Sequence, residues 1–230
     1  SLANIWDFFK TIIGFFQSFF IVIFFKADVI FAKGGFVTVP MIFWSKIFKI
    51  PLVIHESDVV MGRANLWALN YAQKVCLGFP IECYRQNLPL GKLVYTGIPV
   101  NPEFLKTPVR TEGRLKILIT GGSQGSAKIN YLIREILTEL LKKYEIWHLS
   151  GKRDFEKLLN SPFYHLFEFT SLMPCLMRDA DLVVTRAGAG TLAEISAAGK
   201  AAIIIPLKSA SKEHQEENAK VYFERNAAVV

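Results

Sequence analysis

Short runs of Val, Ile and Leu alternate with amphipathic stretches along most of the chain. The apolar runs occupy 27–32, 51–55, 74–79 and 92–97, and then 115–120, 145–151, 165–169, 181–185 and 201–206. Segments that fit helices lie at 39–48, 62–72, 127–143, 153–159, 172–178, 190–198 and 213–225. Uninterrupted apolar runs are typical of parallel strands that are covered on both faces. The alternation therefore predicts an α/β fold of doubly wound parallel sheets with right-handed crossovers.

One segment, 101–114, breaks this alternation. It carries two prolines and several charges, and it predicts no regular element. Beyond it the pattern begins again with a strand and a glycine turn. A chain of 230 residues is long enough for two cores. We therefore predict two Rossmann-like lobes that face a cleft, at 1–100 and 115–230, with 101–114 as the linker.

The first 50 residues are rich in phenylalanine and hold 12 of its 19 copies. The apolar stretch between Lys10 and Lys26 is interrupted by Gln17 and Ser18, and it is shorter than a membrane span, which needs about 20 apolar residues. Helical spacing instead gives it a broad apolar face. Such a face fits packing against a sheet, and the excess of Phe also fits contact with lipid. We expect both, with residues 5–25 at an anionic membrane surface.

Basic residues outnumber acidic ones by 27 to 20, so the net charge is +7. Residues 1–110 carry 11 basic and 6 acidic side chains, which gives this half +5 of the total. A basic, Phe-rich half suits an anionic membrane, and no nucleic-acid recognition motif accompanies the charge. Three cysteines without a Cys-x-x-Cys pair argue against a disulfide framework or a structural zinc site. Asp179-Ala180-Asp181 lies at the start of a strand, away from the edge where ligands bind, so we expect no metal there.

A glycine turn, GGSQGS at 121–126, directly follows one predicted strand and directly precedes a helix. Glycines in this place let backbone N–H groups approach an anion at the helix N-terminus. The turn is neither a P-loop, which needs Gly-Lys-Ser/Thr, nor the GxGxxG fingerprint. It favours a diphosphate site, and a turn whose glycines serve only packing is the alternative.

Further candidates lie where predicted strands end, which is where open α/β sheets bind ligands. The second lobe adds a turn at 186–191, followed by Glu194, and a polar helix start at 213–218. Glu194 fits two hydrogen bonds from a ribose diol, and the alternative is a Glu that only stabilises the helix dipole. The first lobe adds the glycine turn at 34–40 and the HESD segment at 55–58, where a His–Glu pair is more often structural than catalytic.

In order and spacing these motifs resemble glycosyltransferase family 28, in particular its lipid I N-acetylglucosaminyltransferases. The motifs are GGFVTVP at 34–40, HESD at 55–58, GIPVN at 97–101, GGSQGS at 121–126, IWHLSGK at 146–152, TRAGAGTLAEI at 185–195 and EHQEENA at 213–219. The resemblance implies a GT-B fold and inverting transfer of GlcNAc from UDP-GlcNAc to the MurNAc C4 hydroxyl of undecaprenyl-linked lipid I, which makes lipid II for peptidoglycan. It implies no required metal or other cofactor. It also implies a peripheral place at the cytoplasmic face of the bacterial plasma membrane, and cell-wall synthesis proteins as partners.

The resemblance also implies roles for individual residues. On the donor side these are Ser123, Gln124, Gly125, Thr170, Arg186, Ala189, Gly190, Thr191, Glu194, His214, Gln215 and Asn218. Of these, Thr170 is implied near uracil and Glu194 at the ribose hydroxyls, while the last three are implied near the GlcNAc hydroxyls and phosphates. On the acceptor side they are Gly34, Gly35, Thr38, Pro40 and Asp58, together with His55 and Glu56.

The chain departs from the family pattern at two residues and at both ends. Asp58 stands where the family has Asn, and Asn101 stands where it has an Arg that would bind diphosphate through two hydrogen bonds. We also expect truncation at both ends, because no His-bearing glycine loop precedes Ser1 and the family's C-terminal helices do not follow Val230. The catalytic base is unassigned, with Asp58, His55 and Glu56 as candidates. Two alternatives stay open: a related transferase with another lipid acceptor, and a non-catalytic homologue that binds UDP-sugar.

Overall fold

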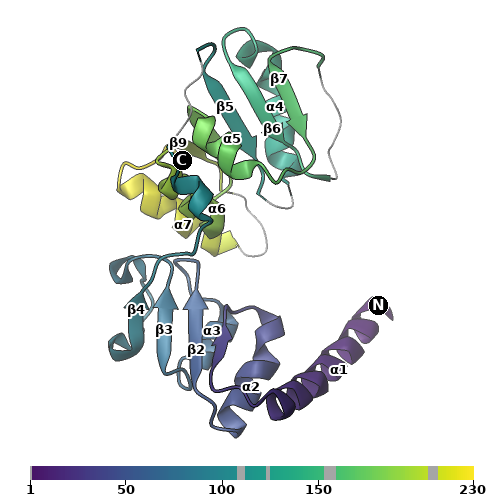
Figure 1. The fold of residues 1–230 in the computed structure, drawn as a ribbon, viewed down its shortest axis with the longest axis vertical. Helices are drawn as coiled ribbons and strands as arrows, with labels where there is room; N and C mark the ends of the chain where they lie inside the picture. Colours follow the sequence, from purple (N-terminus) through teal and green to yellow (C-terminus); the bar gives the residue numbers. More distant parts are fainter. Residues whose placement is uncertain (1, 108–111, 123–124, 153–158, 207–211) are drawn as a thin grey trace. The chain divides into compact units, whose positions relative to one another are not determined.

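The computed structural model describes residues 2–107, 112–122, 125–152, 159–206 and 212–230, and at 2–11 and 212–213 it describes the backbone alone. The chain folds into two compact units, Ser1–Gly97 and Ile98–Val230 (Figure 1). Each unit is built on one sheet. Within the described ranges every strand pairing is parallel, as the uninterrupted apolar runs predict.

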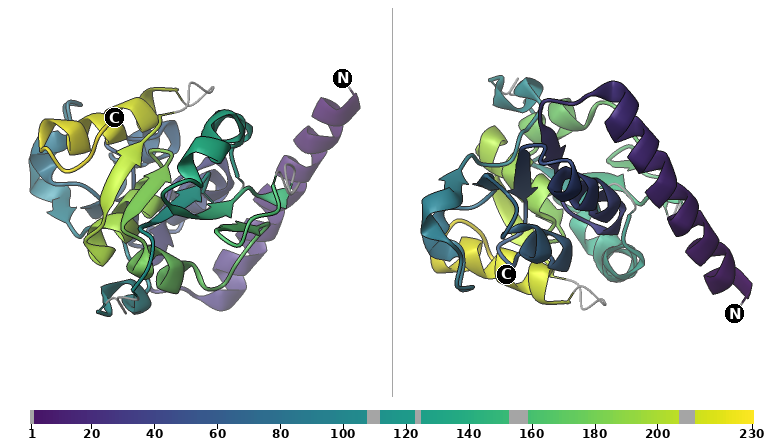
Figure 2. Two further views of the ribbon diagram at one scale, coloured as in Figure 1. Left: turned by 90° about the horizontal axis from the view of Figure 1, so that it is seen from above. Right: turned by 90° about the horizontal axis from the view of Figure 1, so that it is seen from below.

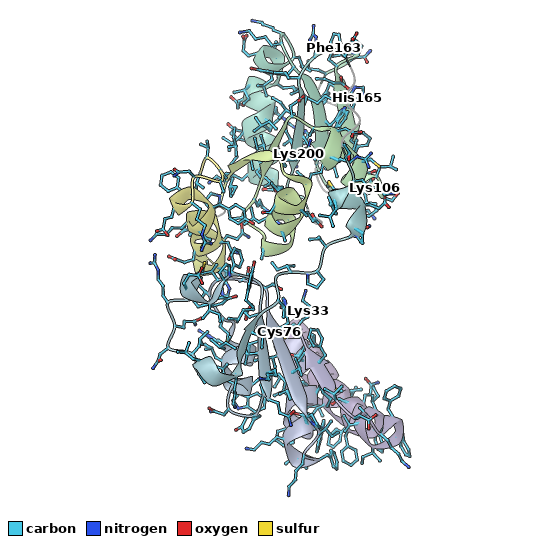
Figure 3. All side chains as sticks on the ribbon, turned by 60° about the vertical axis from the view of Figure 1, so that its left-hand side comes forward. Lys33, Cys76, Lys106, Phe163, His165 and Lys200 are labelled. Carbon is cyan, nitrogen blue, oxygen red and sulfur yellow. The ribbon has the colours of Figure 1, made fainter. Side chains whose placement is uncertain are left out.

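The first unit has a four-stranded sheet whose strands follow one another in chain order. The strands are β1 (Ile30–Ala32), β2 (Leu52–Glu56), β3 (Lys74–Leu77) and β4 (Leu93–Tyr95), and the helices are α1 (Leu2–Phe25), α2 (Val39–Ile47) and α3 (Arg63–Ala68). Strand residues such as Leu52, Ile54 and Val75 are almost completely buried and form the core. Cys76 on β3 is a free thiol, as are the other two cysteines (Figure 3).

Along its described side chains, residues 12–25, helix α1 packs on its unit with one side and leaves aromatic rings exposed on another. Trp44 of α2 donates a hydrogen bond from Nε1 to the Phe15 carbonyl at 3.2 Å, and its ring lies 4.8 Å from the rings of Phe15 and Phe19. Phe24 and Phe25 are exposed, at 78% and 79%. Figure 2 shows the N-terminal part of α1 extending away from the rest of its unit. Among the residues that the structure describes, no helix combines the length and apolarity needed to cross a membrane.

The second unit has a five-stranded sheet in the order β7-β6-β5-β8-β9. Its strands are β5 (Lys116–Thr120), β6 (Glu145–Leu149), β7 (Tyr164–Phe167), β8 (Leu182–Thr185) and β9 (Ala201–Ile204), and its helices are α4 (Ala127–Leu140), α5 (Met173–Asp179), α6 (Ala189–Ala198) and α7 (Lys212–Glu224). From β5 the chain winds outward through β6 and β7 and then returns to the other side of β5 for β8 and β9. β5 and β8 therefore flank the topological switch point, beside which sheets of this kind bind ligands.

Helices cover both faces of this sheet, and the side chains of strand β5 pack against both sets of helices. Successive strand residues point to opposite faces, so Ile117 and Ile119 pack with residues of α4, whereas Leu118 packs on the other face with Met177 of α5 and Leu192 of α6. An apolar cavity of about 670 Å³ lies on the α4 side. No predicted site residue is among the described residues that line it.

Part of the expected linker belongs to the second unit. Pro102–Leu105 forms a 3-10 turn, η4, and Phe104 within it is 4% exposed and packs in the core of that unit with residues of α5 and α6. Burial of this one aromatic side chain brings the start of 101–114 into the second unit. Three further 3-10 turns, which the hydrophobic pattern does not predict, are η1 (Phe36–Thr38), η2 (Ile81–Cys83) and η3 (Leu90–Lys92). The helix expected at 153–159 falls almost entirely outside the described residues.

Candidate functional site

The glycine turn after β5 closes so tightly that two of its glycines have no room for a side chain. A Cβ added to Gly121 would lie 2.3 Å from the Ser126 nitrogen, and one added to Gly125 would lie 2.3 Å from the Ser150 oxygen. Gly122 and Gly125 also have positive φ angles, 77° and 74°, which residues with side chains rarely adopt. Ser126 caps α4 with its hydroxyl. The turn therefore lies at the N-terminus of α4, where N–H groups and the helix dipole favour an anion.

The turn after β8 brings a cation to this glycine turn. A Cβ added to Gly122 would lie 3.1 Å from Nη2 of Arg186, so the guanidinium lies against the backbone of the turn. Burial lowers the pKa of Arg186, but a guanidinium stays charged at physiological pH. Among the described residues, neither Nε of Arg186 nor the buried hydroxyl of Thr185 has a hydrogen-bond partner. The two sides of the switch point thus combine backbone donors with a fixed positive charge and unused polar groups.

Helix α6 begins at this second turn. Gly188 is its N-cap, and Ala189, Gly190 and Thr191 form its first turn. A Cβ added to Gly190 would meet nothing within 4 Å, so there is open space beside it. Glu194 lies one turn further along the helix and is half-buried, and this burial raises the pKa of its carboxyl. A hydroxyl that donates a hydrogen bond to a partly desolvated carboxylate stabilises its charged form, so Glu194 is suited to accept hydrogen bonds from a sugar diol.

Helix α7 supports the turn after β8. Asn218 is fully buried and donates from Nδ2 to the Ala187 carbonyl at 3.1 Å. This contact favours a role in holding the turn over direct contact with a sugar. His214 and Gln215, at the start of the same helix, are half-buried.

The other predicted donor-side residues lie on the same unit or outside the described ranges. Thr170 follows β7, and its Oγ1 accepts a hydrogen bond from the Leu172 nitrogen at 3.0 Å. Ser123 and Gln124 are outside the described residues. Turns after β5, β7 and β8 all leave the carboxyl edge of one parallel sheet, so the structure gathers most of the described donor-side residues at that edge.

In the first unit, the turn after β1 has a fixed shape. Gly34 and Gly35 have φ angles of 84° and 80°, and a Cβ added to Gly34 would lie 2.8 Å from Nδ2 of Asn65. Thr38 donates from Oγ1 to the Gly35 carbonyl at 2.8 Å. Pro40 occupies the first turn of α2, where its missing N–H has no partner to lose.

Glu56, at the end of β2, organises the loop that follows it. The buried carboxylate accepts hydrogen bonds from the Asp58 nitrogen at 3.1 Å, from the Gly62 nitrogen at 2.9 Å and from Nδ2 of Asn65 at 2.9 Å. Both oxygens are thus engaged by neutral donors. Such contacts favour the structural alternative for Glu56 over action as a base.

His55 is engaged in a similar way. Its ring is buried, and Nε2 lies 3.0 Å from the Gly97 carbonyl. Because a carbonyl only accepts, Nε2 carries the proton, and Nδ1 faces the Ser57 hydroxyl at 3.4 Å. Asp58 is half-buried and keeps its place as the remaining carboxylate candidate for a base.

Asn101 has a local structural contact. Its side chain accepts a hydrogen bond from the Glu103 nitrogen at 2.9 Å and so caps η4. The family's Arg at this position would lack that cap. Among the described residues, no group of three or more His, Cys, Asp or Glu side chains is arranged to hold a metal ion.

The sequence does not predict the hydrogen-bond partners of three buried polar residues. Asn65 contacts Glu56, while Asn130 and His148 contact each other across α4 and β6. The only signal in the sequence is a polar residue at a position where the hydrophobic pattern calls for an apolar one. That signal marks a buried polar group, but it does not identify the partner.

Two family models match the chain. Residues 1–77 match the glycosyltransferase family 28 N-terminal domain, and residues 116–230 match the glycosyltransferase family 28 C-terminal domain. Two relatives are named UDP-N-acetylglucosamine–N-acetylmuramyl-(pentapeptide) pyrophosphoryl-undecaprenol N-acetylglucosamine transferase. One, from Bacillus cereus, carries the number 2 after this name and is 41% identical over 89% of this chain and 61% of its own length. The other, from Lachnospira eligens, is 37% identical over the whole chain and 68% of its own length.

Solved structures resemble the chain as well. A MurG from Acinetobacter baumannii has a TM-score of 0.73 and 28% identity, over 96% of this chain and 64% of that protein. A kitacinnamycin glycosyltransferase has a TM-score of 0.67 at 13% identity, over 89% of this chain and 62% of that protein, so it bears on the fold alone. The GT-B prediction is confirmed, and the chain spans about two thirds of the length of these relatives. The chain belongs to glycosyltransferase family 28.

Proposed function

We propose that the protein transfers GlcNAc from UDP-GlcNAc to the C4 hydroxyl of MurNAc in undecaprenyl-linked lipid I, with inversion at the transferred carbon and without a metal. The names of the relatives that are about 40% identical support this substrate pair. In the reaction the acceptor oxygen attacks C1 of GlcNAc, and the bond from C1 to the UDP oxygen breaks. The electron pair leaves with UDP, and the acceptor proton passes to a base.

The observation that carries the proposal is the pair of turns at the switch point. The turn after β5 is tight enough to need glycine, and the guanidinium of Arg186 lies against it. The leaving UDP gains negative charge as the sugar bond breaks, and preorganised donors beside that charge lower the barrier. The N-termini of α4 and α6 add their dipoles at the same edge. This arrangement suits a nucleoside diphosphate better than a neutral ligand.

The remaining donor contacts belong to the proposal too. Glu194 binds the ribose hydroxyls, and Thr170 lies near uracil. Backbone groups at 189–191 bind the diphosphate, and Ser123 and Gln124 have the same proposed role. His214 and Gln215 reach the GlcNAc hydroxyls, whereas Asn218 acts through the Ala187 carbonyl.

The lipid-linked acceptor implies a membrane surface, and we propose that α1 contacts it. One side of this helix packs on Trp44, while Phe16, Phe20, Phe24 and Phe25 are each more than half exposed. Exposed aromatic rings on a helix beside basic residues favour the interface of an anionic bilayer. The protein would then act at the cytoplasmic face of the bacterial plasma membrane, with its turns at 34–40 and 55–58 on the acceptor side.

A transfer assay tests the function. The complete natural protein that carries this sequence is incubated with UDP-GlcNAc labelled in the sugar and with a lipid I analogue, and labelled product is measured. We expect transfer by the wild type and a loss of about 100-fold in Arg186→Gln, which removes one donor to the leaving group. Lys142→Gln also removes one positive charge, at an exposed site just beyond the C-terminal end of α4, and should act like wild type. No transfer by the wild type would contradict the proposal.

A non-catalytic protein that binds UDP-sugar is the second candidate. His55 and Glu56 are both engaged in structural contacts, and Asn101 caps a turn where the family has Arg. Calorimetric titration with UDP-GlcNAc separates the two functions. Binding without transfer to any lipid acceptor would favour this candidate, and binding with transfer to lipid I would exclude it.

A further inference from the structure

A chain of hydrogen bonds between buried side chains runs beneath the glycine turn after β5. The Tyr164 hydroxyl on β7 lies 3.1 Å from Nδ1 of His148 on β6, and Nε2 of His148 lies 3.0 Å from Oδ1 of Asn130 on α4. Nδ2 of Asn130 then donates to the Ser150 carbonyl at 2.9 Å. All four residues are buried. The chain thus connects two strands and a helix to the segment that follows β6.

The direction of every bond in this chain is fixed. The Ser150 carbonyl only accepts, so the Asn130 amide must point its nitrogen at Ser150 and its oxygen at His148. That oxygen also only accepts, so Nε2 of His148 carries the ring proton. Burial lowers the pKa of His148 to about 4, so the ring is neutral at pH 7. Nδ1 then carries no proton, and it accepts the hydrogen bond that Tyr164 donates.

The Ser150 carbonyl, at the end of this series of hydrogen bonds, contacts the glycine turn directly. A Cβ added to Gly125 would lie 2.3 Å from the Ser150 oxygen and 3.0 Å from Cα of Gly151. The backbone at Ser150 and Gly151 is thus the surface against which Gly125 rests. Gly125 in turn donates from its nitrogen to the Gly122 carbonyl at 2.9 Å, which closes the turn. A shift of the Ser150 carbonyl would therefore move the turn.

We propose that Asn130 and His148 are positioning residues that hold the Ser150 carbonyl against Gly125 and thereby fix the end of the glycine turn, Gly125 and Ser126, where α4 begins and the diphosphate of a nucleotide sugar binds. This inference rests on the proposed function, since it assumes that the turn binds diphosphate. Neither side chain touches the ligand. Both act through the backbone of the segment that follows β6.

Titration of UDP into purified variants tests the inference. Asn130→Ala removes the donor to Ser150, and His148→Phe removes the donor to Asn130, and each should weaken UDP binding at least tenfold. Asn130→Asp keeps the size and shape of the side chain but puts an oxygen where the donor was, and it should weaken binding as well. In His148→Gln the amide can still donate to Asn130 and accept from Tyr164, so binding should stay within threefold of wild type.

A matched control separates weaker UDP binding from a general loss of folding stability. Ile133→Val deletes one buried methylene on the same helix, in an apolar core side chain that takes no part in these hydrogen bonds. It should bind UDP like wild type although it is less stable. Wild-type affinity in Asn130→Asp or in His148→Phe would overturn the positioning role and leave the proposed function intact. Failure of the wild type itself to bind UDP would overturn both.

Discussion

Lowering the pH from 7 to 5 should destabilise the protein through one residue, His148. Burial lowers its pKa from 6.5 to about 4, so the folded protein holds the ring neutral. In the unfolded chain the same ring takes up a proton below pH 6.5. Between pH 4 and 6.5 the unfolded state therefore binds more protons than the folded state. The stability that neutral His148 allows is present above pH 6.5 and is lost as the pH falls toward 4.

The size of the effect follows from the pKa. One pKa unit corresponds to about 1.4 kcal/mol, so a fall from 6.5 to about 4 sets a limit of about 3 kcal/mol. Of this limit, about 2 kcal/mol is lost between pH 7 and pH 5. The physical cause is burial, because a charged imidazolium ring would lose its hydration among the surrounding buried residues.

Urea unfolding followed by circular dichroism at pH 7, 6 and 5 measures this loss. Other groups also titrate in this range, so the wild type is compared with His148→Gln, whose amide has no proton to gain. We expect the wild type to lose about 2 kcal/mol more than the variant between pH 7 and pH 5. Equal losses in the two proteins would refute the reasoning, since they would show that the folded protein accommodates a charged ring at this site.

Four further substitutions have defined outcomes. Gly125→Ala should abolish measurable UDP binding in a calorimetric titration, because Cβ would meet the Ser150 oxygen at 2.3 Å. Gly14→Ala is the contrasting case, because Gly14 lies in open space on α1. It should raise the free energy of unfolding by about 0.5–1 kcal/mol, measured in a thermal melt. Glu56→Gln should cost about 1–3 kcal/mol in urea unfolding, since an amide NH₂ would face backbone donors; an unchanged midpoint would contradict its structural role. Phe104→Ala should lower the free energy of unfolding by about 3–5 kcal/mol, because the side chain packs in the core of the second unit. A loss below about 1 kcal/mol would indicate that η4 is part of the linker.

The sequence predicted the parts of the fold that depend on local patterns. Runs such as KILIT at 116–120 are apolar at every position but the ends, and this is what a strand covered on both faces requires. The glycine turn that follows was also predictable, because its position between strand and helix limits what it can be. The structure adds that Gly121 and Gly125 are required by close backbone contacts with Ser126 and Ser150.

Side-chain partners that are distant in sequence were not predictable. The Asn218 amide, for example, donates to the Ala187 carbonyl, which is 31 residues away. Likewise Asn130 and His148 meet only because α4 packs on β6. A hydrophobic pattern specifies which face of a helix is buried, but it does not specify which polar atoms meet there. Phe104 shows the same limit, since one aromatic residue between two prolines gives no periodicity from which burial could be predicted.

The central claim is that the turns after β5 and β8 together bind a nucleoside diphosphate. Amide hydrogen exchange measured by mass spectrometry, with and without UDP, tests it at the level of segments. The account predicts that UDP slows exchange in peptides covering 121–126 and 186–191, while a peptide covering 55–62 is unchanged. Protection of neither turn in the presence of saturating UDP, or protection confined to the first unit, would contradict it.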